Sequence, residues 1–301
     1  MSVFQLLYIK WFGGNGQKIT GVNLFSSEYN QAEQLKQLTK LYSRGKPAIV
    51  RMPVQDGNLN EFIKLTKLMN GVGITIVALL DEFKNDNSMM NRLSTIRTLA
   101  PFVKYFELFN ELPHMIDLYQ GEKIMSLQSL LDKTNKYCDW IHANIKDSVV
   151  ITMAPYDSLD EREYPVWGVT NTRILKDLIL YTKADKAAMH IYKDSFGAQL
   201  DAIKLAANIK DWNKEAKQYE KEIWITETGA DKWSNHVSYF TDSLKVINNI
   251  FNPEEIIWYR HTVKNHAELD NGFALEWQDI PSYSPLYTKL KTQNVNEHIT
   301  N

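Results

Sequence analysis

Short apolar runs rich in β-branched residues alternate along the chain with longer stretches whose apolar positions recur every three or four residues. The short runs are typical of buried strands, and the longer stretches have the period of helices that cover a core. Repeated alternation of this kind favours βα units around a parallel sheet. Strands are predicted at Thr20–Leu24, Ala48–Met52, Ile74–Leu80, Tyr105–Phe109, Val149–Ala154, Ala187–Tyr192, Glu222–Thr226 and Ile256–Tyr259.

Each of the longer stretches has one apolar stripe and a charged opposite side, as expected for a helix that packs on a sheet. The clearest stripe steps by three and four residues from Leu127 to Ile145. The other stripes are Leu35, Leu38 and Tyr42; Phe62, Leu65 and Met69; Met89, Leu93, Ile96, Ala100 and Val103; Ile174 and Leu178; Leu205, Ile209 and Trp212; and Phe240, Leu244, Ile247 and Phe251.

Eight strands, each followed by a helix, predict an α/β protein with a single-domain (β/α)8 TIM barrel. The main alternative is a doubly wound open sheet. Its usual nucleotide-binding forms are disfavoured, because no G-x-G-x-x-G or G-x-x-x-x-G-K-[ST] motif follows the first strand. We expect residues 18–301 to form the barrel and residues 1–17 to form a small cap segment on it.

Composition and charge exclude several classes of protein. The chain of 301 residues is 44% hydrophobic and 23% charged, which is unlike a disordered or a collagen-like sequence. A formal net charge of −2 provides no basic field to hold a nucleic-acid backbone. The chain has one cysteine, Cys138, which we expect to be a small buried side chain on a helix rather than part of a disulfide.

The first residues, MSVFQLLYIKWFGG, lack the basic region and the small-residue cleavage site of a signal peptide. No apolar run approaches the ~20 residues of a membrane span. We therefore expect a cytoplasmic protein, or one released by lysis as a phage-encoded protein would be.

Two glutamates follow predicted strands directly. Glu111 comes after the fourth strand in YFELFNELPH, and Glu227 comes after the seventh in EIWITETGAD. In a barrel the carboxyl ends of the strands form the functional face, and strands three βα units apart lie on opposing sides of it. Two facing carboxylates are the groups that glycoside hydrolysis needs, because one protonates the leaving oxygen while the other attacks the anomeric carbon.

Other strand ends carry residues that fit this chemistry. Arg51 ends the second strand, and a cation there would keep a neighbouring carboxylate ionised. His190 and Tyr192 end the sixth strand with their side chains on the same side. Tyr156 follows the fifth strand, and Trp258 lies on the eighth, where an aromatic face could bind the C–H surface of a sugar.

From about residue 20 to residue 292, these motifs occur in the order Gly-Val-Asn at Gly21–Asn23, Arg51, Asn110-Glu111, His190-x-Tyr192, Glu227 and Trp258. In this order they resemble the clan A glycoside hydrolases, which are retaining (β/α)8 enzymes that include families 5 and 39. The stretch GFALEWQDIPSYSPLYTKL, residues 272–290, resembles the segment after strand eight in such enzymes.

The resemblance implies a role for each matching residue. Glu111 would be the acid/base and Glu227 the nucleophile. Asn110 would hydrogen-bond the sugar 2-hydroxyl, and Arg51 would steady Glu227. Tyr192 would contact the nucleophile. His190 would line the site. Beside these roles, we expect Tyr156 and Trp258 to contact the substrate from their positions on or after the strands.

The third strand departs from the family 5 pattern. Many members have a histidine at its end, whereas here the strand ends in LLDEF with Asp81 and Glu82. A further cluster after the eighth strand invites a metal interpretation but matches no zinc motif, so we interpret it as a polar loop. It consists of His261, His266, Glu268 and Asp270. We expect neither a metal nor an organic cofactor.

The sequence therefore predicts a retaining glycoside hydrolase that cleaves a β-linked oligo- or polysaccharide through a covalent glycosyl-enzyme. In this mechanism Glu111 has to hold a proton while Glu227 is ionised. Three alternatives stay open: a carbohydrate-binding barrel without turnover, a transglycosylase that uses the same two glutamates, and a barrel enzyme acting on something other than a sugar. The identity of the sugar, endo or exo action, and the oligomeric state are not encoded in a recognisable pattern.

Overall fold

The computed structural model describes residues 20–24, 49–81, 85–112, 126–161, 163–164, 167–192, 199–216, 220–230 and 232–259, and the backbone of 262–263, 276–277 and 282–283. The expected cap, residues 1–17, lies outside this set, as does the helical stripe of Leu35, Leu38 and Tyr42. None of the described helices is long and apolar enough to cross a membrane.

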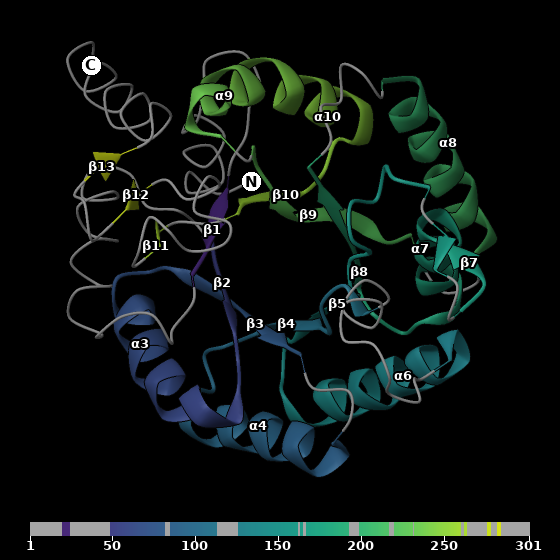
Figure 1. Ribbon diagram of the computed structural model, residues 1–301. Helices are drawn as coiled ribbons and strands as arrows, with labels where there is room; N and C mark the ends of the chain where they lie inside the picture. The colour runs from purple at the N-terminus through teal and green to yellow at the C-terminus, as the bar shows by residue number, and fades with distance from the viewer. Residues whose placement is uncertain are drawn as a thin grey trace, which may run out of the picture.

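Eight parallel strands close into a barrel in the order β1-β10-β9-β8-β5-β4-β3-β2, and Figure 1 looks along its axis. This confirms the predicted (β/α)8 barrel, and each predicted strand is present with ends shifted by no more than a few residues. The barrel strands are β1 Gly21–Asn23, β2 Ile49–Pro53, β3 Thr75–Leu80, β4 Tyr105–Leu108, β5 Val149–Ile151, β8 Lys186–Ile191, β9 Glu222–Thr228 and β10 Glu255–Trp258.

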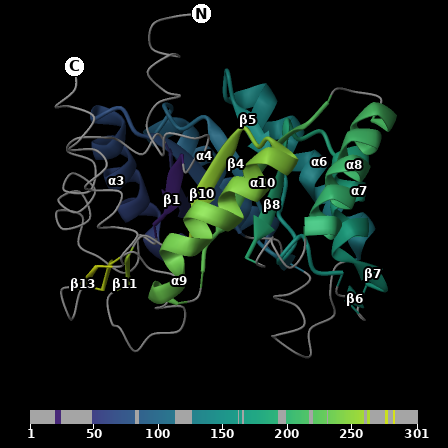
Figure 2. The same cartoon turned by 90° about the horizontal axis from the view of Figure 1, so that it is seen from above.

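Helices surround the barrel, as Figures 1 and 2 show. Apolar residues of the helices are buried in the same cluster as outward-facing residues of the strands. The helices are α3 Leu59–Gly71, α4 Asp86–Leu99, α6 Leu127–Asn144, α7 Asn171–Tyr181, α8 Gln199–Glu215, α9 Trp233–Ser238, η3 Tyr239–Ser243 and α10 Leu244–Phe251. Cys138 is buried and free on α6, as predicted. The helix predicted around Phe240 to Phe251 is divided instead, because η3 is a π-helical turn between α9 and α10.

The loops contain several short helical turns and strands, and none of these was predicted from the sequence. A hairpin of β6 Glu163–Tyr164 and β7 Val169–Thr170 precedes α7 and lies beside it in both views. The turn η2 Asp56–Asn58 leads into α3. A three-stranded sheet contains β11 Thr262–Val263, β12 Glu276–Trp277 and β13 Ser282–Tyr283.

The barrel interior is filled in layers. One layer is apolar, and in it the rings of Tyr105 and Trp224 stack at 5.4 Å between centroids. Gly21 lies at this level because it pairs with Ile49, and a Cβ on residue 21 would lie only 2.5 Å from the carbonyl oxygen of Ile49. Because inward side chains alternate along a strand, the residues two positions further along form the next layer. This second layer contains the polar residues Asn23, Arg51, Glu107, His190 and Thr226.

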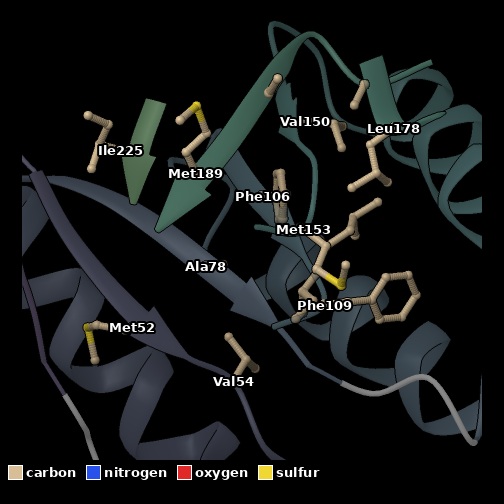
Figure 3. Close-up of a cluster of buried hydrophobic side chains, with 14 of the residues drawn as sticks. Met52, Val54, Ala78, Phe106, Phe109, Val150, Met153, Leu178, Met189 and Ile225 are labelled. Carbon is tan, nitrogen blue, oxygen red and sulfur yellow. The ribbon is translucent and has the colours of Figure 1, made fainter. Parts of the chain in front are cut away.

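The opposite faces of the strands pack against the helices and form the main hydrophobic core. Figure 3 shows part of it, where Phe106 of β4 and Phe109, the residue after β4, lie near Met153 and Leu178. Burial of apolar side chains on this scale is the dominant stabilising term in such a fold. The rigid outer core therefore supports the polar layer from behind.

Candidate active site

Arg51 is the centre of the polar layer. Its side chain is 1% exposed, and each of its five N–H groups has an acceptor. Nε and Nη2 donate to the two oxygens of Glu107 at 2.5 and 3.0 Å, and Nη1 donates to Glu227 Oε1 at 2.5 Å. The remaining N–H groups donate to Asn23 Oδ1 at 3.0 Å and Asn110 Oδ1 at 2.9 Å. A fully satisfied guanidinium is held in one orientation.

Glu107 was not identified from the sequence. It lies in the middle of β4, is 0% exposed, and also accepts a hydrogen bond from Thr226 Oγ1 at 3.0 Å. The two hydrogen bonds that Glu107 accepts from Arg51 fix the orientation of the guanidinium. In this orientation Nη1 points to Glu227, and the second N–H of Nη2 points to Asn110. The sequence did contain a signal, because an acidic side chain inside an apolar strand is almost never buried without a partner.

Glu227 is aimed into the barrel by a bulge in β9. Between Ile225 and Glu227 the pairing with β8 skips one residue, since Met189 pairs with Ile225 and His190 with Glu227. The pairing with β10 shows the same extra residue. Bulges of this kind re-aim a side chain, and here both Thr226 and Glu227 face the interior. The sequence predicted that Glu227 would lie just beyond the strand, whereas it lies inside β9.

Three neighbours set the charge of Glu227. Burial alone would raise its pKa, but the charges of His190 and Arg51 and the hydrogen bonds from Tyr192 and Arg51 outweigh burial and hold the pKa below its usual range. The Tyr192 hydroxyl donates to Glu227 Oε2. Glu227 is therefore an ionised carboxylate at neutral pH, with one donor on each oxygen.

Glu111 is carried by a strained turn after β4. Phe109 and Glu111 both have positive φ, at 69° and 45°, which is unusual for residues other than glycine. The conformation turns Phe109 out of the barrel, where its ring packs 6.1 Å from that of Tyr137. The mouth is left to Asn110 and Glu111. Since Arg51 occupies the amide oxygen of Asn110, the NH2 group is what Asn110 can offer a ligand.

Asp81 at the end of β3 holds this turn. Its Oδ1 accepts the backbone N–H of Asn110 at 3.2 Å, while Leu112 N–H points to Met153 Sδ at 3.3 Å. Strained backbone persists only where its surroundings impose it. Asp81 stands where many family 5 enzymes have histidine, and it positions the loop that carries Glu111.

If the site is the glycosidase centre that the sequence predicts, Asp81→Ala should lower kcat/KM by roughly 10- to 100-fold, because a displacement of Glu111 by about 1 Å is enough for a loss of that size. The loss should be larger for glycosides with poor leaving groups, and Asp81→Asn should recover part of it through its remaining amide oxygen. Steady-state kinetics on matched aryl glycosides measures both effects. Equal losses on all substrates, with no recovery in Asp81→Asn, would contradict the positioning role.

Glu111 and His190 form a close pair. Nδ1 of His190 lies 2.5 Å from Oε1 of Glu111 and 3.7 Å from Oε2 of Glu227. Burial alone would lower the pKa of His190, but the charges of Glu227 and Glu111 and the hydrogen bond to Glu111 raise it. The hydrogen bond between Nδ1 and Oε1 lies beside the mouth of the barrel.

Tyrosines rather than a tryptophan line the adjacent wall. The rings of Tyr156 and Tyr259 lie 6.4 and 6.0 Å from that of Tyr192, and all three are partly exposed. Trp258, which was expected to contact substrate, is 0% exposed, and the rings of His236 and Tyr239 pack edge-on against it. Its neighbour Ile257 belongs to the interior layer, so Trp258 lies on the helix side and Tyr259 on the side of the mouth.

The structure thus brings seven of the eight sequence-predicted site residues together, whereas Trp258 packs in the outer core. The seven are Arg51, Asn110, Glu111, Tyr156, His190, Tyr192 and Glu227. It adds Glu107, Thr226 and Tyr259, and it gives Asn23 a function in holding Arg51. The loop cluster that begins at His261 lies outside the described side chains.

A closed parallel barrel with two facing glutamates at the carboxyl ends of its strands is the architecture of the (β/α)8 glycosidases, and solved structures bear this out for the fold. An endo-1,4-β-mannanase from Rhizomucor miehei superposes with a TM-score of 0.62 at 10% identity, covering 96% of this chain and 97% of that one. For a β-glucosidase from Thermotoga maritima the TM-score is 0.60 at 12% identity, covering 95% and 99%.

A glycoside hydrolase family 17 β-1,3-glucanosyltransferase from Rhizomucor miehei has the same fold, with a TM-score of 0.57 at 16% identity over 90% of this chain and 97% of that one. No family model matches the sequence, and no curated protein matches it. At these identities the comparisons establish the fold alone. They confirm the predicted resemblance to the clan A barrels at that level.

Proposed function

We propose that the protein is a retaining glycoside hydrolase that cleaves β-linked oligo- or polysaccharide, with Glu227 as nucleophile and Glu111 as acid/base. The observation that carries the proposal is the spacing of the two carboxylates. One carboxylate oxygen of Glu111 and one of Glu227 lie within 4.8 Å of each other. Carboxyl groups about 5–5.5 Å apart favour retention, whereas about 6.5–9.5 Å leaves room for the water that inversion requires.

In the first step Glu227 attacks the anomeric carbon as the bond to the leaving oxygen breaks, and Glu111 donates a proton to that oxygen. The lowered pKa of Glu227 supports the role of nucleophile, because only the ionised form attacks. Nδ1 of His190 lies 2.5 Å from Oε1 of Glu111, so Glu111 shares a hydrogen-bonded proton, which it would donate to the leaving oxygen.

In the second step Glu111 takes a proton from water, and the resulting hydroxide attacks the glycosyl-enzyme, releasing the sugar with its original configuration and freeing Glu227. The NH2 of Asn110 would donate to the sugar 2-hydroxyl, a contact that strengthens in the transition state of such reactions. Tyr156, Tyr192 and Tyr259 offer apolar ring surface and hydroxyl groups, which suit a sugar.

The first experiment is reducing-end release from a panel of β-glucans, mannans, xylans, galactans and bacterial exopolysaccharides, with wild type beside Glu227→Ala. Release by the wild type alone supports hydrolysis and identifies the linkage. Products longer than the substrate indicate transglycosylation, which uses the same two glutamates. Binding without release by either protein indicates a carbohydrate-binding barrel and contradicts the proposal.

Glu111→Ala is expected to reduce kcat/KM by about 10²–10⁴-fold on glycosides with poor leaving groups, the usual contribution of a general acid. Aryl glycosides with acidic leaving groups should lose far less in the first step, since they depart without a proton. Kinetics across a series of leaving-group pKa values measures this difference. The same loss on every substrate would rule out the acid role.

A further inference from the structure

Three different donor groups converge at the mouth of the barrel. One carboxylate oxygen of Glu111, Nδ1 of His190 and one carboxylate oxygen of Glu227 lie within 4.8 Å of one another. The three residues are 8%, 0% and 5% exposed, so water competes little for them. They come from the loop after β4 and from the neighbouring strands β8 and β9, which the barrel holds in fixed register.

Their spacing is close to that of a tetrahedral metal site. Zinc binds imidazole nitrogen at about 2.0–2.1 Å and carboxylate oxygen at about 2.0–2.2 Å, so its ligand atoms lie roughly 3.3–3.5 Å from one another. Here His190 Nδ1 is 2.5 Å from Glu111 and 3.7 Å from Glu227, and these values bracket the required one. Small side-chain rotations would bring the three donors around one ion.

The charges of the site also favour a cation. The site holds three buried carboxylates, those of Glu107, Glu111 and Glu227. The guanidinium of Arg51 pairs with Glu107 and Glu227, and His190 pairs with Glu111. Arg51 binds Glu227 through Oε1, while Oε2 is the oxygen that lies nearer to His190. A divalent ion between Glu111 and Glu227 would balance the excess acidic charge without displacing Arg51.

We propose that Glu111, His190 and Glu227 bind a divalent transition-metal ion such as Zn²⁺, and that the bound ion inhibits the enzyme. One imidazole and two carboxylates suit zinc, whereas Mg²⁺ and Ca²⁺ prefer six or more oxygen ligands. The inhibition, unlike the binding, rests on the proposed function. The ion would engage the nucleophile and the acid/base together, so it would compete with substrate.

The affinity should be moderate. Metal-binding histidines usually donate their other ring N–H to a second group, and loss of that support weakens binding by about 10–100-fold. Within the described part of the chain, Nε2 of His190 is buried without a hydrogen-bond partner. We therefore expect a dissociation constant on the order of micromolar rather than the far tighter binding of a structural zinc site.

Calorimetric titration of the full-length protein with Zn²⁺ tests the site without any substrate. We expect one ion per chain, at least about tenfold weaker binding in His190→Gln and Glu111→Gln, and no comparable binding of Mg²⁺ or Ca²⁺. His142→Gln is the matched control, because that histidine is partly exposed on α6 and pairs with Asp185. Its affinity for Zn²⁺ should equal that of the wild type.

Unchanged zinc affinity in the folded His190→Gln and Glu111→Gln proteins would overturn the proposal. So would loss of binding in a His261→Gln/His266→Gln variant, which would place the ion on the loop after the barrel. The two hypotheses fail separately. Zinc binding without cleavage of any glycan contradicts the hydrolase. Cleavage of a glycan by a protein that does not bind zinc, and that zinc does not inhibit, contradicts only the metal site.

Discussion

Under the proposed mechanism, Glu227→Ala should lower kcat on a glycan that the wild type cleaves by about 10⁴-fold or more, the scale of loss when a group essential to covalent catalysis is removed. Azide, added to the variant with an activated aryl β-glycoside, should restore part of the turnover. The small anion can occupy the space left by the carboxylate and attack the anomeric carbon, so the glycosyl azide formed has the inverted configuration. Product analysis by NMR gives the configuration directly.

The matched control for this variant is Glu222→Ala. Glu222 begins the same strand, β9, at the opposite end from the mouth, and 58% of its side chain is exposed. Its loss should leave kcat within about twofold of the wild type, as expected for a surface substitution away from the site. A folded Glu227→Ala protein that azide cannot rescue would contradict the assignment of Glu227 as nucleophile.

Glu107→Ala should destabilise the fold by about 3–5 kcal/mol, because removing one partner of a buried ion pair leaves the other charge uncompensated. Arg51 would retain Glu227, Asn23 and Asn110 but lose the carboxylate that accepts two of its N–H groups. Urea unfolding followed by circular dichroism measures the change. Glu107→Gln, which keeps the volume and one acceptor oxygen, should recover part of the loss.

The comparison for Glu107 is a surface ion pair. Asp139 on α6 contacts Lys183, and both side chains are about half exposed, so Asp139→Ala should cost less than about 1 kcal/mol. If Glu107→Ala proved as mild as Asp139→Ala, the buried cluster would not be the structural centre of the barrel mouth. Should Glu107→Ala fail to accumulate, Glu107→Gln allows the same measurement.

The strand pattern could be predicted because it depends on local periodicity. Eight apolar runs of strand length, separated by helical stripes, leave few architectures in which every apolar face is buried. The two glutamates could be predicted for a related reason. Each directly follows a buried run, where an acidic side chain is poorly solvated unless it has a function, and a parallel barrel gathers such strand ends on one face.

Three features of the site could not be predicted from periodicity alone. The bulge in β9 turns Glu227 inward, although strict alternation from Trp224 would place it on the helix side. The positive φ of Phe109 removes its ring from the mouth. On β10, Trp258 pairs with Val22 and packs in the outer core, whereas the ring of Tyr259 lies beside that of Tyr192.

The sequence by itself determined the barrel, the strand ends and the chemical character of the groups placed there, because these follow from the order of apolar and polar residues along the chain. Only the tertiary structure decided which groups touch. Glu107 and Glu227 lie 56 and 176 residues from Arg51 along the chain, and each of the three comes from a different strand. Their contacts depend on the closure and register of the sheet, and on local breaks in alternation that are stable only when the surrounding core imposes them.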